Sequence, residues 1–224
     1  MIELSETHAA VATYPLILTN LAQVRCVVVG GGAVAERKVR DLLAGGACPA
    51  VISPALTAAL AAWREQGRLA HVARAYQDGD LDGAFLAIAA TDDRAANAAV
   101  AAEGARRGIL VNIADDPPAG NFHTAAVVRR GDLLLAVSTG GSSPALTARI
   151  RRDLEDRYGD EYGRLLALLR ALRDGPARRV PRERRMSLWR RLVSDDMLGW
   201  LRAGEDARAE THAQSLIAEL QEQS

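Results

Sequence analysis

The chain has 224 residues, of which 49% are hydrophobic and 25% charged, and its net charge is zero. This composition excludes a disordered or fibrous protein, and the length allows a main domain with a smaller appendage. No apolar stretch approaches the roughly 20 residues that a bilayer requires, and no basic leader precedes an apolar run, so we expect a cytoplasmic protein that contacts no membrane.

Charge is unevenly distributed along the chain. Residues 149–191 contain 14 arginines and 7 acidic residues, a net charge of +7, whereas the rest of the chain carries −7. A solvated helical surface is the usual explanation of an arginine run. The alternative is that this part of the protein binds an anion. The two cysteines, Cys26 and Cys48, are expected to be buried and reduced, because no metal-binding cluster accompanies them.

The first predicted elements lead into a glycine-rich turn. Residues 14–18 are apolar and predict a short strand at a sheet edge. The run Val27-Val28-Val29 predicts a strand buried on both faces, and a helical pattern follows it directly. Between them stands the spacing Gly30-x-Gly32-x-x-Ala35, which is typical of dinucleotide sites. There Gly30 permits the turn, Gly32 lets a pyrophosphate approach the backbone, and the helix N-terminus holds the anion. A glycine turn needed for close packing alone is the alternative.

Strands and helices then alternate. Strands are predicted at residues 50–52, 69–73, 84–88 and 110–113, one helix from Ser53-Pro54 through Trp63 to Gly67, and another over residues 94–107. Such alternation predicts a parallel, doubly wound sheet that binds ligands at the carboxyl ends of its strands. Those ends carry Ser53-Pro54, Thr91-Asp92-Asp93 and Asp115-Asp116-Pro117-Pro118. Ser53 stands where an acidic residue commonly binds the ribose, and no arginine follows it for a 2′-phosphate, so we expect NAD rather than NADP.

The pattern changes after the fifth strand. Residues 123–130 and 133–138 are extended apolar runs around Gly131-Asp132 and predict an antiparallel hairpin, whose exposed edge favours a homodimer. The segment 138–146 follows, with Ser143 as a typical N-cap and Pro144 as a first helical residue; its glycines leave N–H groups free for an anion, or it is a plain capped helix. Helices are predicted over residues 149–158, 161–173, 182–193 and the tail to 224.

With these motifs in this order, the chain resembles the precorrin-2 dehydrogenase and sirohydrochlorin ferrochelatase family of siroheme synthesis, the N-terminal module of siroheme synthase. The matching motifs are Val28–Lys38, Asn112–Asp115 followed by Phe122, and Ser138–Pro144 leading into Arg149. The resemblance implies an α/β fold in three regions. These are a Rossmann-type NAD-binding domain over residues 1–114, a dimerisation and active-site hairpin region over 115–148, and a helical tetrapyrrole-binding domain over 149–224.

The resemblance also implies the activity, which is NAD-dependent oxidation of precorrin-2 to sirohydrochlorin, with Fe²⁺ insertion as a further step. Asp115 is similar to the catalytic aspartate, although its Asp-Asp-Pro-Pro setting is also typical of a simple turn. The predicted cofactor contacts are Gly30, Gly32, Ala33, Val34, Ser53, Pro54, Thr91 and Asp92. The predicted substrate contacts are Ser138, Thr139, Gly140, Ser142, Arg149 and Arg152, because a substrate with eight carboxylates requires a basic wall. No metal ligand is predicted, and His123 is a weaker candidate for assisting at the metal.

Two other functions compete with this one. The first is a dehydrogenase that does not insert iron, which the sequence does not distinguish from the bifunctional enzyme. The second is an NAD-sensing module that binds nucleic acid through its basic helices. Against the second, no helix-turn-helix pattern is recognisable and the arginines alternate with leucines.

Overall fold

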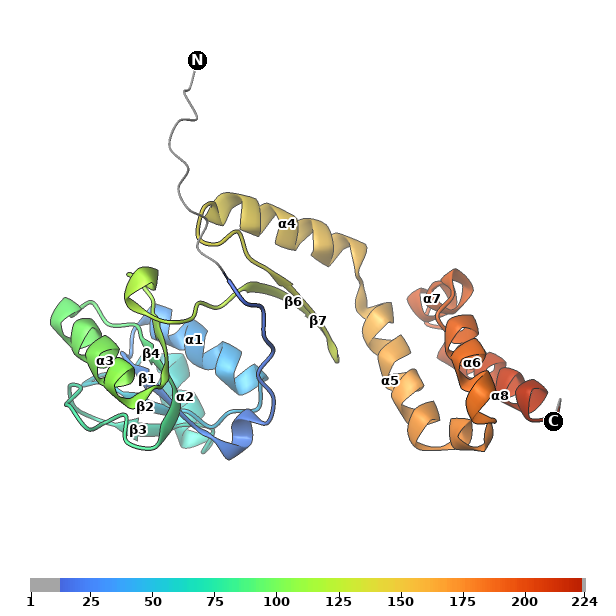
Figure 1. Cartoon of the computed structure of the whole chain (residues 1–224), viewed down its shortest axis with the longest axis horizontal. Coiled ribbons are helices and arrows are strands. Elements are labelled where there is room, and N and C mark those ends of the chain that lie inside the picture. The colour runs from blue at the N-terminus through green and yellow to red at the C-terminus, as the bar shows by residue number, and fades with distance from the viewer. Residues whose placement is uncertain (1–12, 223–224) are drawn as a thin grey trace, which may run out of the picture. The chain divides into compact units, whose positions relative to one another are not determined.

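The computed structural model describes residues 13–222, which form two compact units, residues 13–124 and residues 125–222 (Figure 1). Each unit has its own core of buried apolar side chains. The boundary between the compact units follows Thr124, and the functional boundaries expected after residues 114 and 148 remain predictions. No helix among the described residues is long and apolar enough to cross a membrane.

The first unit is built on a five-stranded sheet, as predicted. Its strands are β1 (Arg25–Val29), β2 (Ala50–Ile52), β3 (Ala70–Val72), β4 (Ala84–Ala89) and β5 (Leu110–Ile113). Their order in the sheet is β3-β2-β1-β4-β5, and every neighbouring pair is parallel. The chain therefore moves outward from β1 through β2 and β3 and then returns to place β4 on the other side of β1. A doubly wound sheet binds its ligand at such a switch point.

Three helices cover the two faces of this sheet. They are α1 (Ala33–Ala44), α2 (Ala58–Glu65) and α3 (Arg94–Arg107). Val28 packs in the cluster formed with α1 and α2, whereas Val27 and Val29 pack in the cluster that contains Val100 of α3. Successive side chains of a strand point to opposite faces, so the valine run of β1 is buried on both sides, at 0 to 3% exposure.

The strand expected over residues 14–18 is wrong. This segment forms no strand, and Tyr14 and Ile17 are 87% and 71% exposed. A short apolar run becomes a strand only where a sheet edge accepts its backbone. Asn121 covers the outer edge of β5 instead, because its N–H donates to the carbonyl of Val111 and its Oδ1 accepts from the N–H of the same residue, at 2.9 and 2.7 Å.

The expected start of the second helix and the expected burial of one cysteine are also wrong. Helix α2 begins at Ala58, five residues after Ser53, and Thr57 is its N-cap because its hydroxyl accepts from the N–H of Leu60 at 3.3 Å.

Of the two cysteines that were expected to be buried, Cys48 is exposed. Cys26 is buried within β1, and burial raises the pKa of its thiol.

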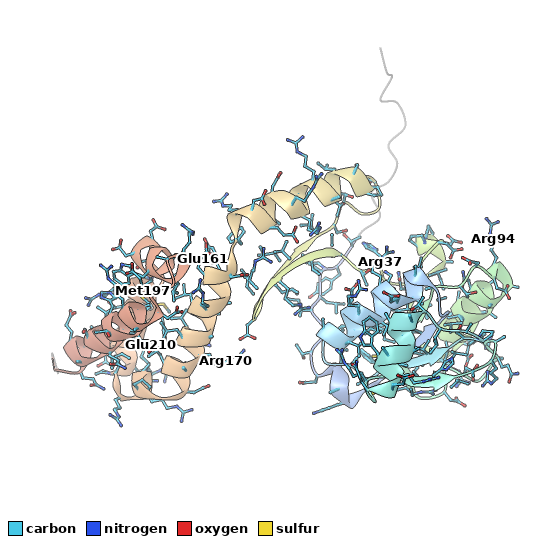
Figure 2. The ribbon with its side chains drawn as sticks, turned by 180° about the vertical axis from the view of Figure 1, so that it is seen from behind. Arg37, Arg94, Glu161, Arg170, Met197 and Glu210 are labelled. Atoms are coloured by element: carbon cyan, nitrogen blue, oxygen red, sulfur yellow. The ribbon has the colours of Figure 1, made fainter. Side chains whose placement is uncertain are left out.

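The second unit combines a hairpin with helices. Strands β6 (Ala126–Arg130) and β7 (Leu133–Val137) pair antiparallel, as predicted, and α4 (Pro144–Arg157) packs against them. The remaining helices are α5 (Asp160–Asp174), α6 (Arg185–Leu192), α7 (Asp195–Arg202) and α8 (Asp206–Glu222), with short 3₁₀ turns over Pro176–Arg179 and Arg182–Arg184. Leu188, Leu192 and Met197 (labelled in Figure 2) are fully buried at the centre of this helical core.

Candidate functional site

In the glycine turn after β1, Gly30 and Gly32 are glycines for different physical reasons. Gly30 has φ +123°, and a Cβ there would overlap the carbonyl of Ala90, its carbon 2.7 Å away. The fold itself requires glycine at this position. Gly32 has φ −87° and ψ −172°, which any residue adopts, and a Cβ there would meet no described atom within 4 Å. The space beside Gly32 is therefore free for a ligand to approach the backbone.

Helix α1 begins beside that space. Gly32 is its N-cap, and no side chain caps the helix. Ala33 and Val34 are exposed, whereas Ala35 is buried against the sheet. The first N–H groups of an uncapped helix and its dipole favour a negative charge. A cofactor that carries a pyrophosphate fits this end of α1, and Gly32, Ala33 and Val34 are the residues that would contact it.

The loop after β2 supports the turn. Ser53 is 6% exposed, and its hydroxyl donates to the carbonyl of Ala55 at 2.6 Å. A Cβ on Gly31 would overlap both the Ser53 hydroxyl and the Ala55 carbonyl, so this loop packs tightly on the glycine turn. Pro54 is exposed. The structure thus places both predicted contacts beside the turn, with the Ser53 hydroxyl engaged in shaping its own loop.

The loop after β4 reaches the opposite side of the turn and connects it to β5. Thr91 follows the Ala90 carbonyl that faces Gly30, and its own carbonyl accepts a hydrogen bond from Asn97 Nδ2 at 3.0 Å. The same nitrogen donates to Asp115 Oδ1 at 2.9 Å. Asp92 is exposed, and Asp93 is the N-cap of α3. Hydrogen bonds thus link the predicted cofactor residue Thr91 to the predicted catalytic residue Asp115.

A cavity of about 380 Å³ lies beside Asp115. Its lining residues are Arg94, Asn97, Ala98, Ile113, Asp115, Asp116 and Ala119. Arg94, the first residue of α3, extends outward from the sheet in Figure 2. Two aspartates thus line one cavity at the carboxyl end of the sheet, which is a suitable place for proton transfer.

A larger hollow of about 510 Å³ lies between α7 and α8 in the second unit. It contains none of the predicted site residues. Arg208, which lines it, stacks on the Trp200 ring at 4.6 Å and pairs with Glu205 at 2.7 Å, so its charge is already engaged. The smaller cavity at Asp115 is therefore the better candidate for chemistry.

Two further motif residues hold the chain that leaves β5. Asn112 is buried, and its Nδ2 donates to the carbonyl of Phe122 at 3.1 Å, which explains why these two residues belong to one motif. Lys38 of α1 donates to the Thr124 hydroxyl at 2.7 Å, and burial followed by the charge of Arg37 lowers the Lys38 pKa. Both contacts are structural, and neither side chain lines the cavity.

The predicted substrate residues lie in the second unit, at the start of α4. The Thr139 hydroxyl is 2.9 Å from that of Thr147 and donates to the Ser143 carbonyl at 3.2 Å, so it holds the loop onto the helix. Ser143 caps α4 through the N–H of Leu146, as predicted. Ser138, Gly140 and Ser142 are exposed, and the Ser138 hydroxyl accepts from the N–H of Gly140.

Arg149 and Arg152 are exposed on one face of α4 and, among the described residues, form no ion pair with an acidic side chain. Most other arginines of the basic segment are engaged, as in the pairs Arg151–Glu155, Arg164–Asp206, Arg170–Asp132 and Arg191–Glu219. Arg149 and Arg152 therefore present exposed guanidinium groups that no described carboxylate occupies, although Arg152 Nε donates to the Ala148 carbonyl at 3.4 Å.

The sequence analysis missed Asn97. This residue is 4% exposed and connects the loops after β4 and β5. The sequence signal that could have identified it is its position along the helix, because Asn97, Val100 and Gly104 share the buried face of α3. A polar residue on the apolar face of an alanine-rich helix requires a partner in the interior.

The parallel sheet, the glycine turn at its switch point and the uncapped helix define a Rossmann-type dinucleotide-binding protein. Comparison with known families agrees, because residues 17–126 match a family model described as putative NAD(P)-binding. Residues 130–157 match a second model, described as sirohaem biosynthesis protein central. The expected fold class is confirmed, and so is the expectation of a nicotinamide dinucleotide cofactor.

The chain is 40% identical over 206 residues to a siroheme synthase of Chromobacterium violaceum and 39% identical over 202 residues to one of Thioalkalivibrio sulfidiphilus. These matches cover 92% and 89% of this chain but 44% and 41% of those relatives, so the chain spans less than half of their length. The solved structure of SirC, precorrin-2 dehydrogenase, is 30% identical with a TM-score of 0.75, over 91% of this chain and 100% of that one. The chain belongs to this family of siroheme biosynthesis proteins.

Proposed function

We propose that the protein oxidises precorrin-2 to sirohydrochlorin, with NAD as the hydride acceptor, as a step of siroheme biosynthesis. The similarity to SirC over the whole of that chain supports this activity. One structural observation carries it: the hydrogen bonds of Asn97 connect the cofactor-side residue Thr91 to the Asp115 carboxylate. A carboxylate joined to a dinucleotide turn in this way suits an oxidation that removes a hydride and a proton together.

The cofactor would bind at the glycine turn. Gly32 has room for the pyrophosphate, and the N-terminus of α1 supplies N–H donors and a favourable dipole. NAD, when bound, supplies a nicotinamide ring that takes up the hydride. We expect NAD rather than NADP, because Ser53 is followed by Pro54 and Ala55 and no arginine stands there for a 2′-phosphate.

Asp115 would act as the base. Oxidation of precorrin-2 breaks two bonds to hydrogen, so that one hydride leaves for the cofactor and one proton leaves for a carboxylate. Asp115 is exposed at the end of β5, lines the cavity, and keeps one carboxylate oxygen held by Asn97. Its second oxygen is then available for the proton. Asp116 forms the following 3₁₀ turn, since its carbonyl accepts from the N–H of Ala119.

The substrate would be held by cations of the second unit. Precorrin-2 carries eight carboxylates, and Arg149 and Arg152 are the exposed arginines of α4 nearest to the Ser138–Ser142 loop in the sequence. Guanidinium groups bind carboxylates with two parallel hydrogen bonds. We assign substrate binding to these arginines and to the loop that contains Thr139.

An anaerobic assay tests the proposal. Purified protein is mixed with precorrin-2 and NAD, and absorbance follows both sirohydrochlorin and NADH. We expect equal amounts of the two products. The variant Asp115→Ala should bind NAD with wild-type affinity and lose most of its turnover, whereas Asp116→Ala should keep most of it. Wild-type rates in Asp115→Ala would refute the role of this carboxylate, and absence of turnover in the wild-type protein would refute the function.

Iron insertion is a separate prediction for the same site. Incubation with sirohydrochlorin and Fe²⁺ in the absence of NAD distinguishes a bifunctional enzyme from a dehydrogenase alone. In the bifunctional case, Asp115 would accept the two pyrrole protons one after the other, and it would release the first to solvent before it takes the second. Siroheme formation no faster than the protein-free reaction would identify a dehydrogenase without chelatase activity. Because the proposed reaction consumes NAD, we place the protein in the cytoplasm.

The hairpin supports a homodimer. The sheet β6-β7 has two strands among the described residues, and Val127 in β6 is 38% exposed. Strand edges that carry apolar residues favour pairing with a second copy. We expect a dimer in sedimentation equilibrium, and Val127→Arg should shift it toward monomer. A wild-type monomer at micromolar concentration would contradict this assembly.

A further inference from the structure

Asn97 makes contacts that its helix does not need. It lies in the first turn of α3, is 4% exposed, and its Nδ2 donates to the Thr91 carbonyl at 3.0 Å and to Asp115 Oδ1 at 2.9 Å. Neither acceptor belongs to α3. The side chain therefore joins the ends of β4 and β5 at the switch-point side of the sheet.

The contacts determine the orientation of the amide. The Thr91 carbonyl accepts hydrogen bonds and cannot donate them, and an ionised Asp115 is also an acceptor. Only the NH₂ end of Asn97 satisfies both, so the reversed amide is excluded. Both amide hydrogens are then used, one on each acceptor.

The other end of the amide carries a cost for the fold. Asn97 Oδ1 is buried and has no hydrogen-bond partner among the described residues. A buried acceptor without a partner is costly, and an aliphatic side chain of similar size would avoid that cost. The benefit of asparagine here lies with the group that its NH₂ contacts.

We propose that Asn97 is a positioning residue that holds the Asp115 carboxylate in one orientation toward the cavity. This inference rests on the proposed function, in which Asp115 is the base. With Oδ1 of Asp115 fixed by Asn97, Oδ2 is the oxygen that takes the proton.

Helix α3 gives this contact a rigid support. Glu103, two turns further along α3, is fully buried, accepts from the N–H of Gly79 at 3.1 Å and from the Tyr76 hydroxyl, and pairs with Arg107 at 2.7 Å. Burial and the bond to Glu103 raise the pKa of Tyr76, so its hydroxyl remains a donor. Glu103 therefore anchors α3 without touching Asp115, and it offers a matched control on the same helix.

The test compares Asn97→Leu and Asn97→Asp with Glu103→Gln. We expect Asn97→Leu to unfold in urea near the wild-type midpoint, to bind NAD normally, and to lose about 10- to 100-fold in kcat with little change in KM. Asn97→Asp, which sets a carboxylate against Asp115, should lose at least as much in kcat. Glu103→Gln should lower the urea midpoint and leave kcat and KM close to the wild-type values.

A second measurement is independent of turnover. Three-bond NMR couplings report the χ1 rotamers of Asp115, which should be a single rotamer in the wild type and an average in Asn97→Leu. Absence of wild-type turnover would refute the proposed function, while the couplings would still decide the role of Asn97. A wild-type kcat or a single Asp115 rotamer in Asn97→Leu would overturn the inference, as would an equal loss of kcat in Glu103→Gln.

Discussion

Replacement of the two turn glycines by alanine should have opposite consequences. At Gly32 the backbone is extended and a Cβ meets no described atom within 4 Å, so the native fold accepts alanine. Reduced freedom of the unfolded chain stabilises such a variant by about 0.4 to 1 kcal/mol, and the poorer N-cap costs a similar amount, about 0.5 to 1 kcal/mol. The free energy of unfolding should therefore remain within about 1 kcal/mol of wild type, while the added methyl group occupies the space of the pyrophosphate.

At Gly30 the same substitution should damage the fold. The positive φ costs roughly 1 to 3 kcal/mol for a residue with a side chain, and overlap with the Ala90 carbonyl adds roughly 1 to 3 kcal/mol. Gly30→Ala should thus lose about 2 to 6 kcal/mol of stability.

Urea unfolding and calorimetric titration with NAD separate the two effects. We expect Gly32→Ala to be stable and to bind NAD at least tenfold more weakly, and Gly30→Ala to be unstable. Wild-type NAD affinity in Gly32→Ala would refute the position that we assign to the pyrophosphate. Wild-type stability in Gly30→Ala would refute the claim that the positive φ and the nearby Ala90 carbonyl require glycine at this position.

Two further predictions concern the second unit. Hydrogen bonding to Arg202 lowers the pKa of Glu161, so its contribution is present above the ordinary glutamate pKa and is lost as pH falls below it. Glu161→Gln should cost less than about 1 kcal/mol at pH 7, because Arg202 is exposed. Urea midpoints should show the gap closing as the pH falls below the ordinary glutamate pKa and through the lowered pKa of Glu161; a constant gap would contradict this. Met197→Ala should cost about 2 to 5 kcal/mol and leave NAD affinity unchanged, because Met197 lies in the unit that lacks the glycine turn; weaker NAD binding by the folded variant would argue against this separation.

The charge of the basic segment is explained in part by its ion pairs. Glu161 is 6% exposed and receives two hydrogen bonds from Arg202, at 3.1 and 2.7 Å (Glu161 is labelled in Figure 2). The Arg191 guanidinium donates two parallel hydrogen bonds to the Glu219 carboxylate, at 2.8 and 2.7 Å. These arginines hold α5, α6, α7 and α8 together. The Arg191–Glu219 pair accounts for part of the charge of the basic segment, and anion binding by the exposed Arg149 and Arg152 of α4 stays a prediction.

The sequence by itself determined the five strands of the parallel sheet, the hairpin and the class of site, but not the segment 14–18 or the start of α2. Strand β1 is an uninterrupted valine run, and its burial on both faces follows from that pattern. The spacing of Gly30, Gly32 and Ala35 and the aspartate after β5 were readable because each depends on a few neighbouring residues. Such local signals need no knowledge of which strands lie side by side.

The tertiary structure decided what depends on distant residues. The Ala90 carbonyl shows that Gly30 serves the fold and that Gly32 is free, and no pattern within the turn separates those roles. The strand order brings the end of β4 beside that of β5, which lets one amide on α3 reach both. Asn97 has no motif of its own, because its role exists only when residues 6 positions before it and 18 positions after it meet in space.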